Sequence, residues 1–136
     1  MCLGYIIWSP GAANYSVIAQ SKEATRTVRI GDISITYPSV IICKAGEESS
    51  RTIEISNLDN DPKYVVVSLS LVRSSGVDST TISALTGNPY RITLAAYGSV
   101  KDTLSFNPSS KGYAIFDITV NEKLAGSITL YVVSSP

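Results

Sequence analysis

From residue 26 onward, short segments of alternating apolar and polar residues follow one another, separated by turn residues at intervals of about eight to twelve positions. In the segment RTIEISN, for example, Ile53 and Ile55 alternate with polar residues, so one face suits a core and the other suits water. This pattern is typical of the strands of a β-sandwich or barrel. It predicts strands over residues 26–36, 40–44, 50–57, 63–73, 79–84, 90–95, 99–106, 112–120 and 126–134.

The same alternation predicts which side chains form the core. In GYAIFDITV, Ala114, Phe116 and Ile118 share one face, whereas Tyr113 and Asp117 share the other. Gly, Pro, Asn, Asp and Ser are concentrated between the segments, as expected of turns, and only ISALTGNP could form a single turn of helix. The predicted core includes Ile53, Ile55, Val67, Leu69, Leu71, Leu104, Phe116, Ile118, Ile128 and Leu130.

The composition supports an all-β fold. Ile and Val together number 27 against 9 Leu, and Ser and Thr together number 32, which is the balance expected of β-branched strands with hydroxyl groups on their outer faces. The 136 residues suit a single core that needs neither metals nor disulfides. Because the net charge is zero and charged residues make up only 16% of the chain, we expect no nucleic-acid partner and no anionic membrane surface.

The sequence contains no recognisable catalytic chemistry. It lacks His, the commonest general base and metal ligand, and it has no G-x-S-x-G or phosphate-binding motif. We therefore expect no enzymatic activity and no cofactor. In NLDNDPK, Asp59 and Asp61 with Asn57 and Asn60 could offer oxygen ligands to calcium, but their spacing is not that of an EF-hand, so a plain turn is the simpler interpretation.

Several other residues have both a structural and a functional interpretation. Glu47 and Glu48 are most simply part of a solvated turn. Cys2 and Cys43 could form one disulfide, or Cys43 could be a small core residue within the apolar run SVIICKAG. The eight Tyr residues could form a stacking platform for sugars, but their spread over most of the strands favours packing at the edges of the core.

One feature is more specific than alternation. A Pro-marked strand is followed by a turn of Ala-Gly-acidic-Ser type, a strand that ends in Asn, a strand rich in Val and Leu, and a second turn before an F-x-P step and a final hairpin. Over residues 33–134 this order resembles the immunoglobulin-like domains that are common on archaeal and bacterial surfaces. The resemblance implies an Ig-like or jelly-roll antiparallel β-sandwich, a fold that hosts adhesion, assembly and carbohydrate binding alike. The positions that carry it are Pro38, Ala45 to Ser49, Asn57, Val65 to Leu71, Phe106 and Pro108.

The first 24 residues differ from the rest of the chain. The apolar run in MCLGYIIWSP stops at Ser9 and Pro10, which is too short to span a bilayer, and no basic residue occurs before Lys22, where a secretion signal would need one. The segment could be the remnant of a signal, a membrane anchor or a strand that needs a neighbouring sheet. We divide the chain into an N-terminal extension, residues 1–24, and an Ig-like domain, residues 25–136.

The strand interpretation gives the leading hypothesis for function. An apolar terminal segment ahead of a domain that looks complete without it is similar in character to the donor strands of archaeal thread and bundling-pilus subunits, which pair with the sheet of the next subunit. Head-to-tail repetition of such a contact builds a filament of identical copies. Asn14, in the sequon N-Y-S, is a candidate glycosylation site if the chain is exported. The predicted interface residues are Ile6, Ile7, Trp8, Tyr15, Val17 and Ala19.

These features favour an extracellular or cell-surface structural protein that forms a homopolymer and has no membrane span. One alternative is a cell-surface adhesion or carbohydrate-binding module whose N-terminal segment folds back on its own sheet. Another is a component of a virion or of a surface layer. The alternatives differ in whether the first twenty residues contact their own chain or another copy.

Overall fold

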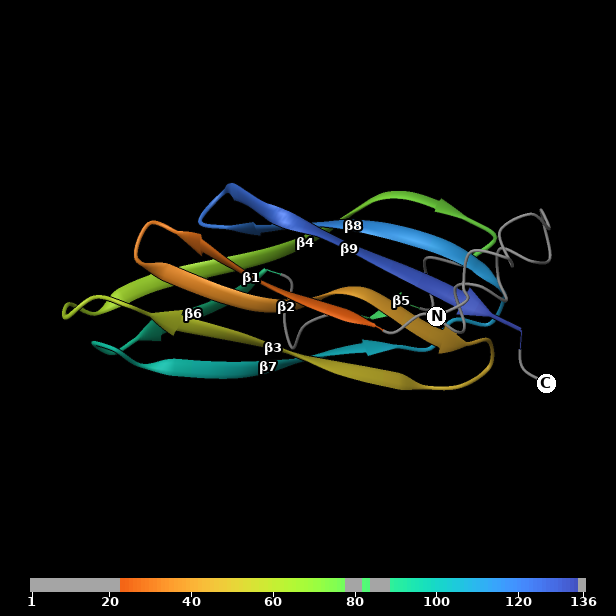
Figure 1. Ribbon diagram of the computed structural model, residues 1–136, viewed down its shortest axis with the longest axis horizontal. Coiled ribbons are helices and arrows are strands. Elements are labelled where there is room, and N and C mark those ends of the chain that lie inside the picture. Colours follow the sequence, from red (N-terminus) through yellow and green to blue (C-terminus); the bar gives the residue numbers. More distant parts are fainter. Residues whose placement is uncertain (1–22, 78–81, 84–88, 135–136) are drawn as a thin grey trace, which may run out of the picture.

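The computed structural model describes residues 23–77, 82–83 and 89–134. Over these ranges every element of regular secondary structure is a β-strand, as the composition predicts (Figure 1). The strands are β1 (Ala24–Ile30), β2 (Ile33–Lys44), β3 (Ser49–Asn57), β4 (Lys63–Ser75), β5 (Ile82–Ser83), β6 (Tyr90–Leu94), β7 (Ser99–Phe106), β8 (Gly112–Val120) and β9 (Lys123–Val133).

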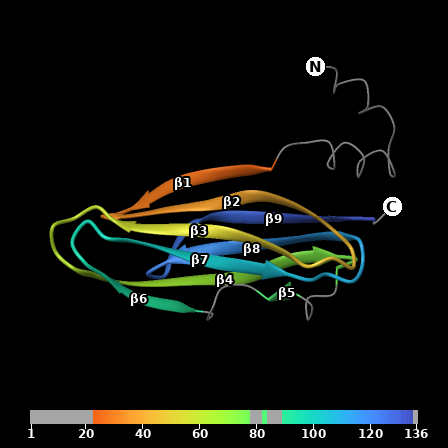
Figure 2. The ribbon, with the colours of Figure 1, turned by 90° about the horizontal axis from the view of Figure 1, so that it is seen from below.

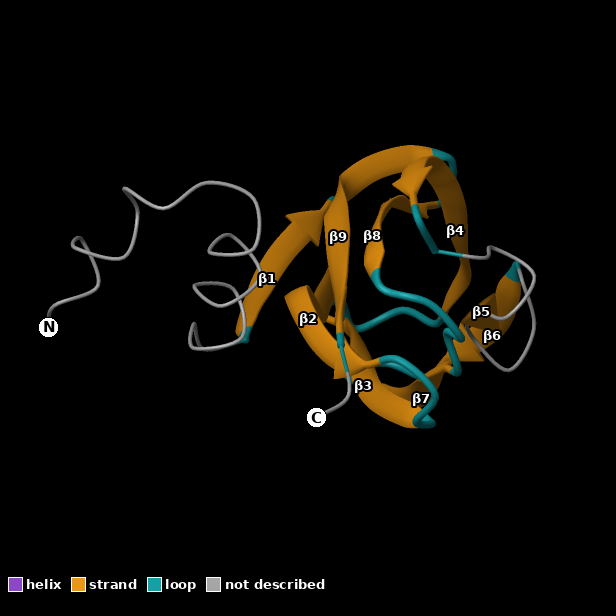
Figure 3. Ribbon diagram, turned by 90° about the vertical axis from the view of Figure 1, so that its right-hand side faces the viewer, coloured by secondary structure: helices purple, strands orange, loops and turns teal. Residues whose placement is uncertain are grey.

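The strands form two layers that β2 joins (Figure 3). One layer contains β5, β7, β3 and the first part of β2, with β1 paired to β2. The other contains the second part of β2 followed by β9, β8, β4 and β6. Among the described strands, every pair is antiparallel except β2 with β9. The result is a β-sandwich that is nearly closed into a barrel.

Pro38 lies where β2 passes from one layer to the other. Before it, β2 pairs with β3 as far as Thr36, and after it, β2 pairs with β9 from Val40 onward. Proline has no N–H to donate to a ladder, so the strand can change partners here without leaving a buried donor unpaired. The residues predicted as a separate strand, 40–44, are therefore the second half of β2.

The strand predicted over residues 26–36 is wrong, because the chain reverses within it. Ile30 pairs with Ile33 across a two-residue turn at Gly31 and Asp32. Gly31 has a φ of 62°, and Gly at this first central position is typical of a type II′ hairpin turn. The Gly-Asp signal is present in the sequence, but apolar residues on both sides of it make the segment read as one strand.

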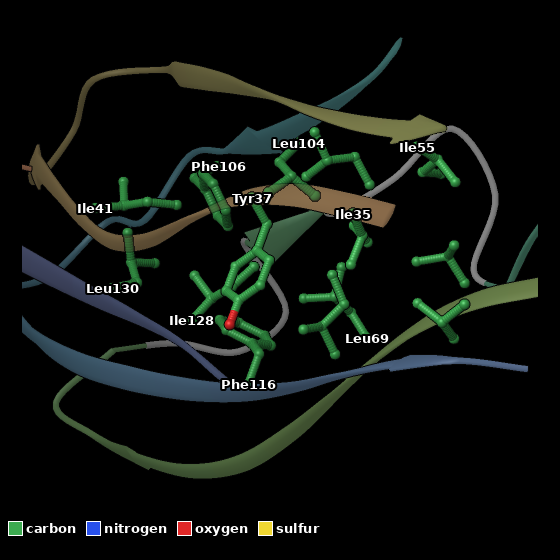
Figure 4. Packing of buried hydrophobic residues seen from close by; sticks show 14 of the residues in the cluster. Ile35, Tyr37, Ile41, Ile55, Leu69, Leu104, Phe106, Phe116, Ile128 and Leu130 are labelled. Atoms are coloured by element: carbon green, nitrogen blue, oxygen red, sulfur yellow. The ribbon is translucent and has the colours of Figure 1, made fainter. Parts of the chain in front are cut away.

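The core lies between the two layers (Figure 4). Nine of the ten predicted core residues are buried, but Leu71 is 42% exposed. The pairing of β4 with β8 shifts register between Leu71 and Arg73, and every residue from Ser70 to Gly76 is exposed. A bulge bends a strand, so β4 leaves the core here and the simple alternation fails.

Two further predictions differ from the structure at the ends of strands. β9 begins at Lys123, earlier than the predicted start at residue 126, because the chain turns at Asn121 and Glu122, both with positive φ. Of the strand predicted over 79–84, the structure describes only β5, and the possible helical turn over 82–89 lies largely outside the described residues.

Tyr37 is the largest of the fully buried side chains and reaches from β2 across the core (Figure 4). Its ring ends beside β9 at Gly126, where an added Cβ would lie 1.9 Å from the Tyr37 hydroxyl oxygen. This close approach requires glycine at position 126. The hydroxyl is buried, and within the described part of the chain it has no hydrogen-bond partner.

Candidate functional site

The residues predicted to form the subunit interface all precede residue 23, so they lie outside the described residues, and so does the candidate glycosylation site Asn14. What the structure describes is the place where their segment joins the domain. The predicted interface residues Ile6, Ile7, Trp8, Tyr15, Val17 and Ala19 therefore stay predictions.

Glu23 fixes the beginning of β1 to the two strands beneath it. Its carboxylate accepts hydrogen bonds from the Arg51 guanidinium, with Nε at 2.7 Å from Oε1, and from the backbone N–H of Ile42 at 3.0 Å. Arg51 also donates to the carbonyl of Ile42 at 3.2 Å. Residues from β2 and β3 therefore hold the point at which the N-terminal extension leaves the domain.

The electrostatics of this pair agree with its geometry. The hydrogen bond from Arg51 holds the pKa of Glu23 below its ordinary value, and Glu23 in turn raises the pKa of Arg51. Both side chains are about one-third exposed, at 33% and 28%. Nothing in the sequence indicates this pair, because its members are 28 residues apart and come together only when β1 folds back over β2 and β3.

β1 is an edge strand. Among the described strands it pairs only with β2, from Ala24 opposite Val40 to Ile30 opposite Ile33, so its outer backbone edge faces away from the sheet (Figure 2). Most of its side chains are exposed, and only Val28 and Ile30 are half-buried. An edge of this kind offers unpaired N–H and C=O groups to another strand.

Four connections lie at the end of the sandwich that is opposite to the start of β1: residues 31–32, 58–62, 95–98 and 121–122 (Figure 2). We call this the hairpin end. Asn57 organises it. Asn57 is only 1% exposed. Its side-chain amide nitrogen donates to the backbone carbonyl of Asp61 at 2.8 Å and to the backbone carbonyl of Ala95 at 3.1 Å. Its side-chain oxygen accepts from the backbone N–H of Asp59 at 3.0 Å. The Asn that ends a strand in the sequence pattern thus joins two loops.

Further bonds brace the hairpin end. The N–H of Leu58 donates to the carbonyl of Asp32 at 2.8 Å, and the N–H of Tyr97 donates to that of Asp59 at 3.0 Å. The Lys63 ammonium lies 3.0 Å from the Asp59 carboxylate, which lowers the pKa of Asp59 and raises that of Lys63. The connections at residues 31–32, 58–62 and 95–98 are therefore held in one arrangement.

A shallow hollow of about 390 Å³ opens beside the hairpin end, on the outer face of β4 and β6. Tyr64 and Val66 come from β4, Arg91 comes from β6, and Asn121 and Glu122 form the turn between β8 and β9. No local pattern in the sequence links these residues as a group. The only signal was the general one that Tyr residues could form a sugar platform, and of the six Tyr in the described ranges Tyr64 and Tyr97 are the exposed ones.

The other candidates of the sequence analysis have structural roles. Glu47 and Glu48 are exposed in the turn between β2 and β3, as predicted. Asp59 is engaged by Lys63, and Asn57 faces into its own loop. Cys43 is a free, buried thiol of the core, and its burial raises its pKa to about 11.

The described ranges contain no group of three or more Cys, Asp or Glu side chains placed to hold a metal ion. In the same ranges no helix is long and apolar enough to cross a membrane.

No protein-family description and no curated protein matches the sequence. Solved structures do resemble the fold. The seventh PapD-like (ASH) domain of human CEP192 is 19% identical, with a TM-score of 0.51, and the match covers 85% of this chain and 95% of that domain. A family 123 glycoside hydrolase from Clostridium perfringens is 14% identical, with a TM-score of 0.51 over 71% of this chain. This chain spans only 23% of that enzyme.

At these identities the similarity establishes the fold alone. It agrees with the resemblance seen in the sequence and with the layer arrangement described above. The described domain therefore has a PapD-like, immunoglobulin-like β-sandwich fold.

Proposed function

We propose that this protein is a structural subunit of an extracellular filament that assembles by donor-strand complementation. In this proposal, the N-terminal segment of one copy pairs as a β-strand with an exposed sheet edge of the next copy. The resemblance of the sequence to archaeal thread and bundling-pilus subunits belongs to the same proposal.

The observation that carries the proposal is the way the extension joins the domain. It enters through β1, whose partner among the described strands is β2 alone, and Glu23 is clamped by Arg51 and Ile42 at the start of that strand. A strand that is fixed at its start gives the preceding segment a fixed point of attachment to its own copy. A fixed attachment point lowers the entropy cost of placing the segment on a neighbouring copy.

The length of the extension suits this role. The 22 residues that precede Glu23 can span about 70 Å when extended. β4, the longest strand of the domain, has 13 residues and spans about 40 Å. An extended segment of this length can therefore pair along the full length of an edge strand in another copy and still leave residues to connect the two copies.

The apolar content of the extension gives the contact its energy. Tyr15, Val17 and Ala19 alternate and would share one face of a strand, while Ile6, Ile7 and Trp8 add further apolar surface. Burial of these side chains contributes several kcal/mol at roughly 25 cal/mol per Å². Head-to-tail repetition of the contact does not close on itself, so it produces a filament.

Deletion of residues 1–20 tests the proposal. The truncated protein keeps Glu23 and β1, so we expect it to retain a β-rich circular dichroism spectrum and to remain monomeric in sedimentation velocity. The full chain should form filaments visible by negative-stain microscopy. A truncated protein that still polymerises would show that assembly does not use the donor segment.

A matched pair of charge substitutions sharpens the test. Val17→Asp places a carboxylate on the face predicted to point into the neighbouring copy, whereas Ser16→Asp places it on the opposite face. We expect Val17→Asp to slow or abolish filament growth measured by light scattering, and Ser16→Asp to leave it close to that of the unmodified chain. Equal effects of the two substitutions would contradict a strand with this register.

A further inference from the structure

The geometry points to a binding site for a neutral sugar ring in the hollow beside the hairpin end. This site is separate from β1 and does not depend on filament assembly. Its walls come from three parts of the chain: Tyr64 and Val66 on β4, Arg91 on β6, and Asn121 with Glu122 in the turn between β8 and β9.

The sheet register places these residues on one outer face. Val66 lies opposite Arg91 in the pairing of β4 with β6, and Tyr64 lies two residues before Val66, so the three side chains share a side of the sheet. The Asn121 side-chain oxygen accepts from the N–H of Val66 at 2.9 Å, and the Asn121 N–H donates to the Val66 carbonyl at 2.8 Å. These two bonds fix the turn against β4 and so fix the position of Glu122 beside the hollow.

Arg91 and Glu122 are unpaired charges at this hollow. The ion pairs of the described residues are those of Arg29, Arg51 and Lys63, and neither Arg91 nor Glu122 takes part in an ion pair or side-chain hydrogen bond there. The guanidinium offers only donors and the carboxylate offers only acceptors. A ligand in the hollow that contacts both residues can accept hydrogen bonds from the guanidinium and donate hydrogen bonds to the carboxylate.

Tyr64 determines the class of that ligand. Its side chain is 58% exposed, which leaves an aromatic surface open to solvent next to the two charges. A pyranose ring has an apolar face that packs on an aromatic ring, and hydroxyl groups at its rim that both donate and accept. Such a ring satisfies Arg91 and Glu122 together without adding charge. A volume of about 390 Å³ lies within the range of small-molecule sites.

The backbone of the turn supports a role for the Glu122 side chain. Asn121 and Glu122 have φ values of 51° and 70°, and a two-residue turn with both values positive strongly prefers Asn-Gly. Asn occupies the first position, as expected, but Glu occupies the position that suits Gly. A strained residue beside a pocket is a reason to look for function at that side chain.

Titration calorimetry of the full chain tests the site. The probes are methyl glycosides of glucose, galactose, mannose and N-acetylglucosamine, together with short oligosaccharides of each. We expect saturable binding of at least one probe. Loss of a hydrogen bond between a charged side chain and its ligand weakens binding by about tenfold or more. We therefore expect Arg91→Ala to reduce the affinity by that factor.

Two further variants show which feature of each side chain matters. Tyr64→Ala removes the ring and should also weaken binding by about tenfold or more, whereas Tyr64→Phe keeps the ring and should retain binding. Glu122→Gly removes the carboxylate but gives the turn its preferred Asn-Gly sequence, so it should lose binding while the melting temperature stays the same or rises. That combination cannot result from misfolding.

Tyr97→Ala is the matched control, because Tyr97 lies at the same end, is 70% exposed and does not line the hollow. It should bind the sugar with unchanged affinity. The proposal is overturned if none of the probes binds, if Tyr64→Ala binds as well as the unmodified chain, or if Tyr97→Ala loses binding to the same extent. Binding of a peptide but of no sugar would also overturn it.

Discussion

The two regions that flank the sandwich, β1 and the hairpin end, are held in different ways. At the hairpin end, the buried side chain of Asn57 joins two loops, and backbone bonds connect the loop that follows β3 both to the turn at Asp32 and to the loop that follows β6. β1 has one strand partner among the described residues and one clamp, between Glu23 and Arg51. Both regions are at the surface, but only one of them is interlocked.

The difference indicates where the domain can change without unfolding. A region whose bonds are shared among several loops opens only when most of the structure opens, whereas an exposed edge strand can open locally at a low free energy. We therefore expect the hairpin end to report the global stability of the domain. β1, which leads to the N-terminal extension, should report a separate and smaller local stability.

The largest effect is expected at the centre of the hairpin end. Asn57→Ala removes the donor to the carbonyls of Asp61 and Ala95 and the acceptor of the Asp59 N–H, so it should lower the free energy of unfolding by about 3 kcal/mol. Urea denaturation measures this change. Asn60→Ala, an exposed position in the same loop, is the control and should change stability by less than about 0.5 kcal/mol.

If Asn57→Ala and Asn60→Ala had similar effects, the hairpin end would not depend on its buried amide. The contrast between an interlocked end and an edge strand would then have to rest on the backbone bonds alone.

A smaller and local effect is expected at β1. Glu23→Ala removes the clamp between a partly exposed carboxylate and Arg51, so it should destabilise β1 by about 1 kcal/mol. Hydrogen exchange should show faster exchange of the β1 amides and unchanged exchange in β8. Glu47→Ala, an exposed turn position, is the control. Faster exchange throughout the domain would mean that β1 is part of the global folding unit.

The same clamp predicts a pH dependence. The bond from Arg51 lowers the pKa of Glu23 in the folded state below its ordinary value of 4.5. A lowered folded-state pKa gives a stabilisation that is fully present above the unfolded-state value and is lost as the pH falls through the folded-state value. Protection of β1 should therefore be full at neutral pH and decrease only below pH 4.5. Glu23→Gln should show a weaker dependence in that range.

The smallest effect on stability is expected in the core, at Tyr37 of β2. Tyr37→Phe removes a buried hydroxyl that has no partner in the described part of the chain, so the free energy of unfolding should stay the same or rise by up to about 1 kcal/mol. Thermal unfolding followed by circular dichroism measures it. A clear loss of stability would show that the hydroxyl is hydrogen-bonded in solution, for example to a buried water molecule.

Much of the fold could be predicted from the sequence because alternation reports burial directly. Phe116 and Ile118 on β8 and Ile128 and Leu130 on β9 are buried as predicted, since buried and less buried side chains alternate without interruption along these stretches. The prediction failed at Leu71 because β4 leaves the core beside a bulge, so that every residue from Ser70 to Gly76 is exposed, and a bulge depends on pairing with the neighbouring strand.

The candidate sites were much less accessible to prediction. Glu23 and Arg51 are 28 residues apart, and Tyr64, Arg91 and Glu122 belong to three separate strands or turns. No local pattern links such residues. They become neighbours only through the order of strands in the sheets, which puts β6 beside β4 and the turn after β8 beside Val66.

By itself, then, the sequence determined the all-β class, the division into short strands and most of the core, because these follow from the local alternation of apolar and polar side chains. It also determined the contrast between an apolar N-terminal extension and a domain with hydroxyl-rich outer faces. Only the tertiary structure decided that β2 serves both layers, that β1 is an edge strand clamped at Glu23, and that Tyr64, Arg91 and Glu122 surround one hollow. The physical reason is that strand order and register depend on pairings between distant segments, and the free energy of each pairing depends on all the others.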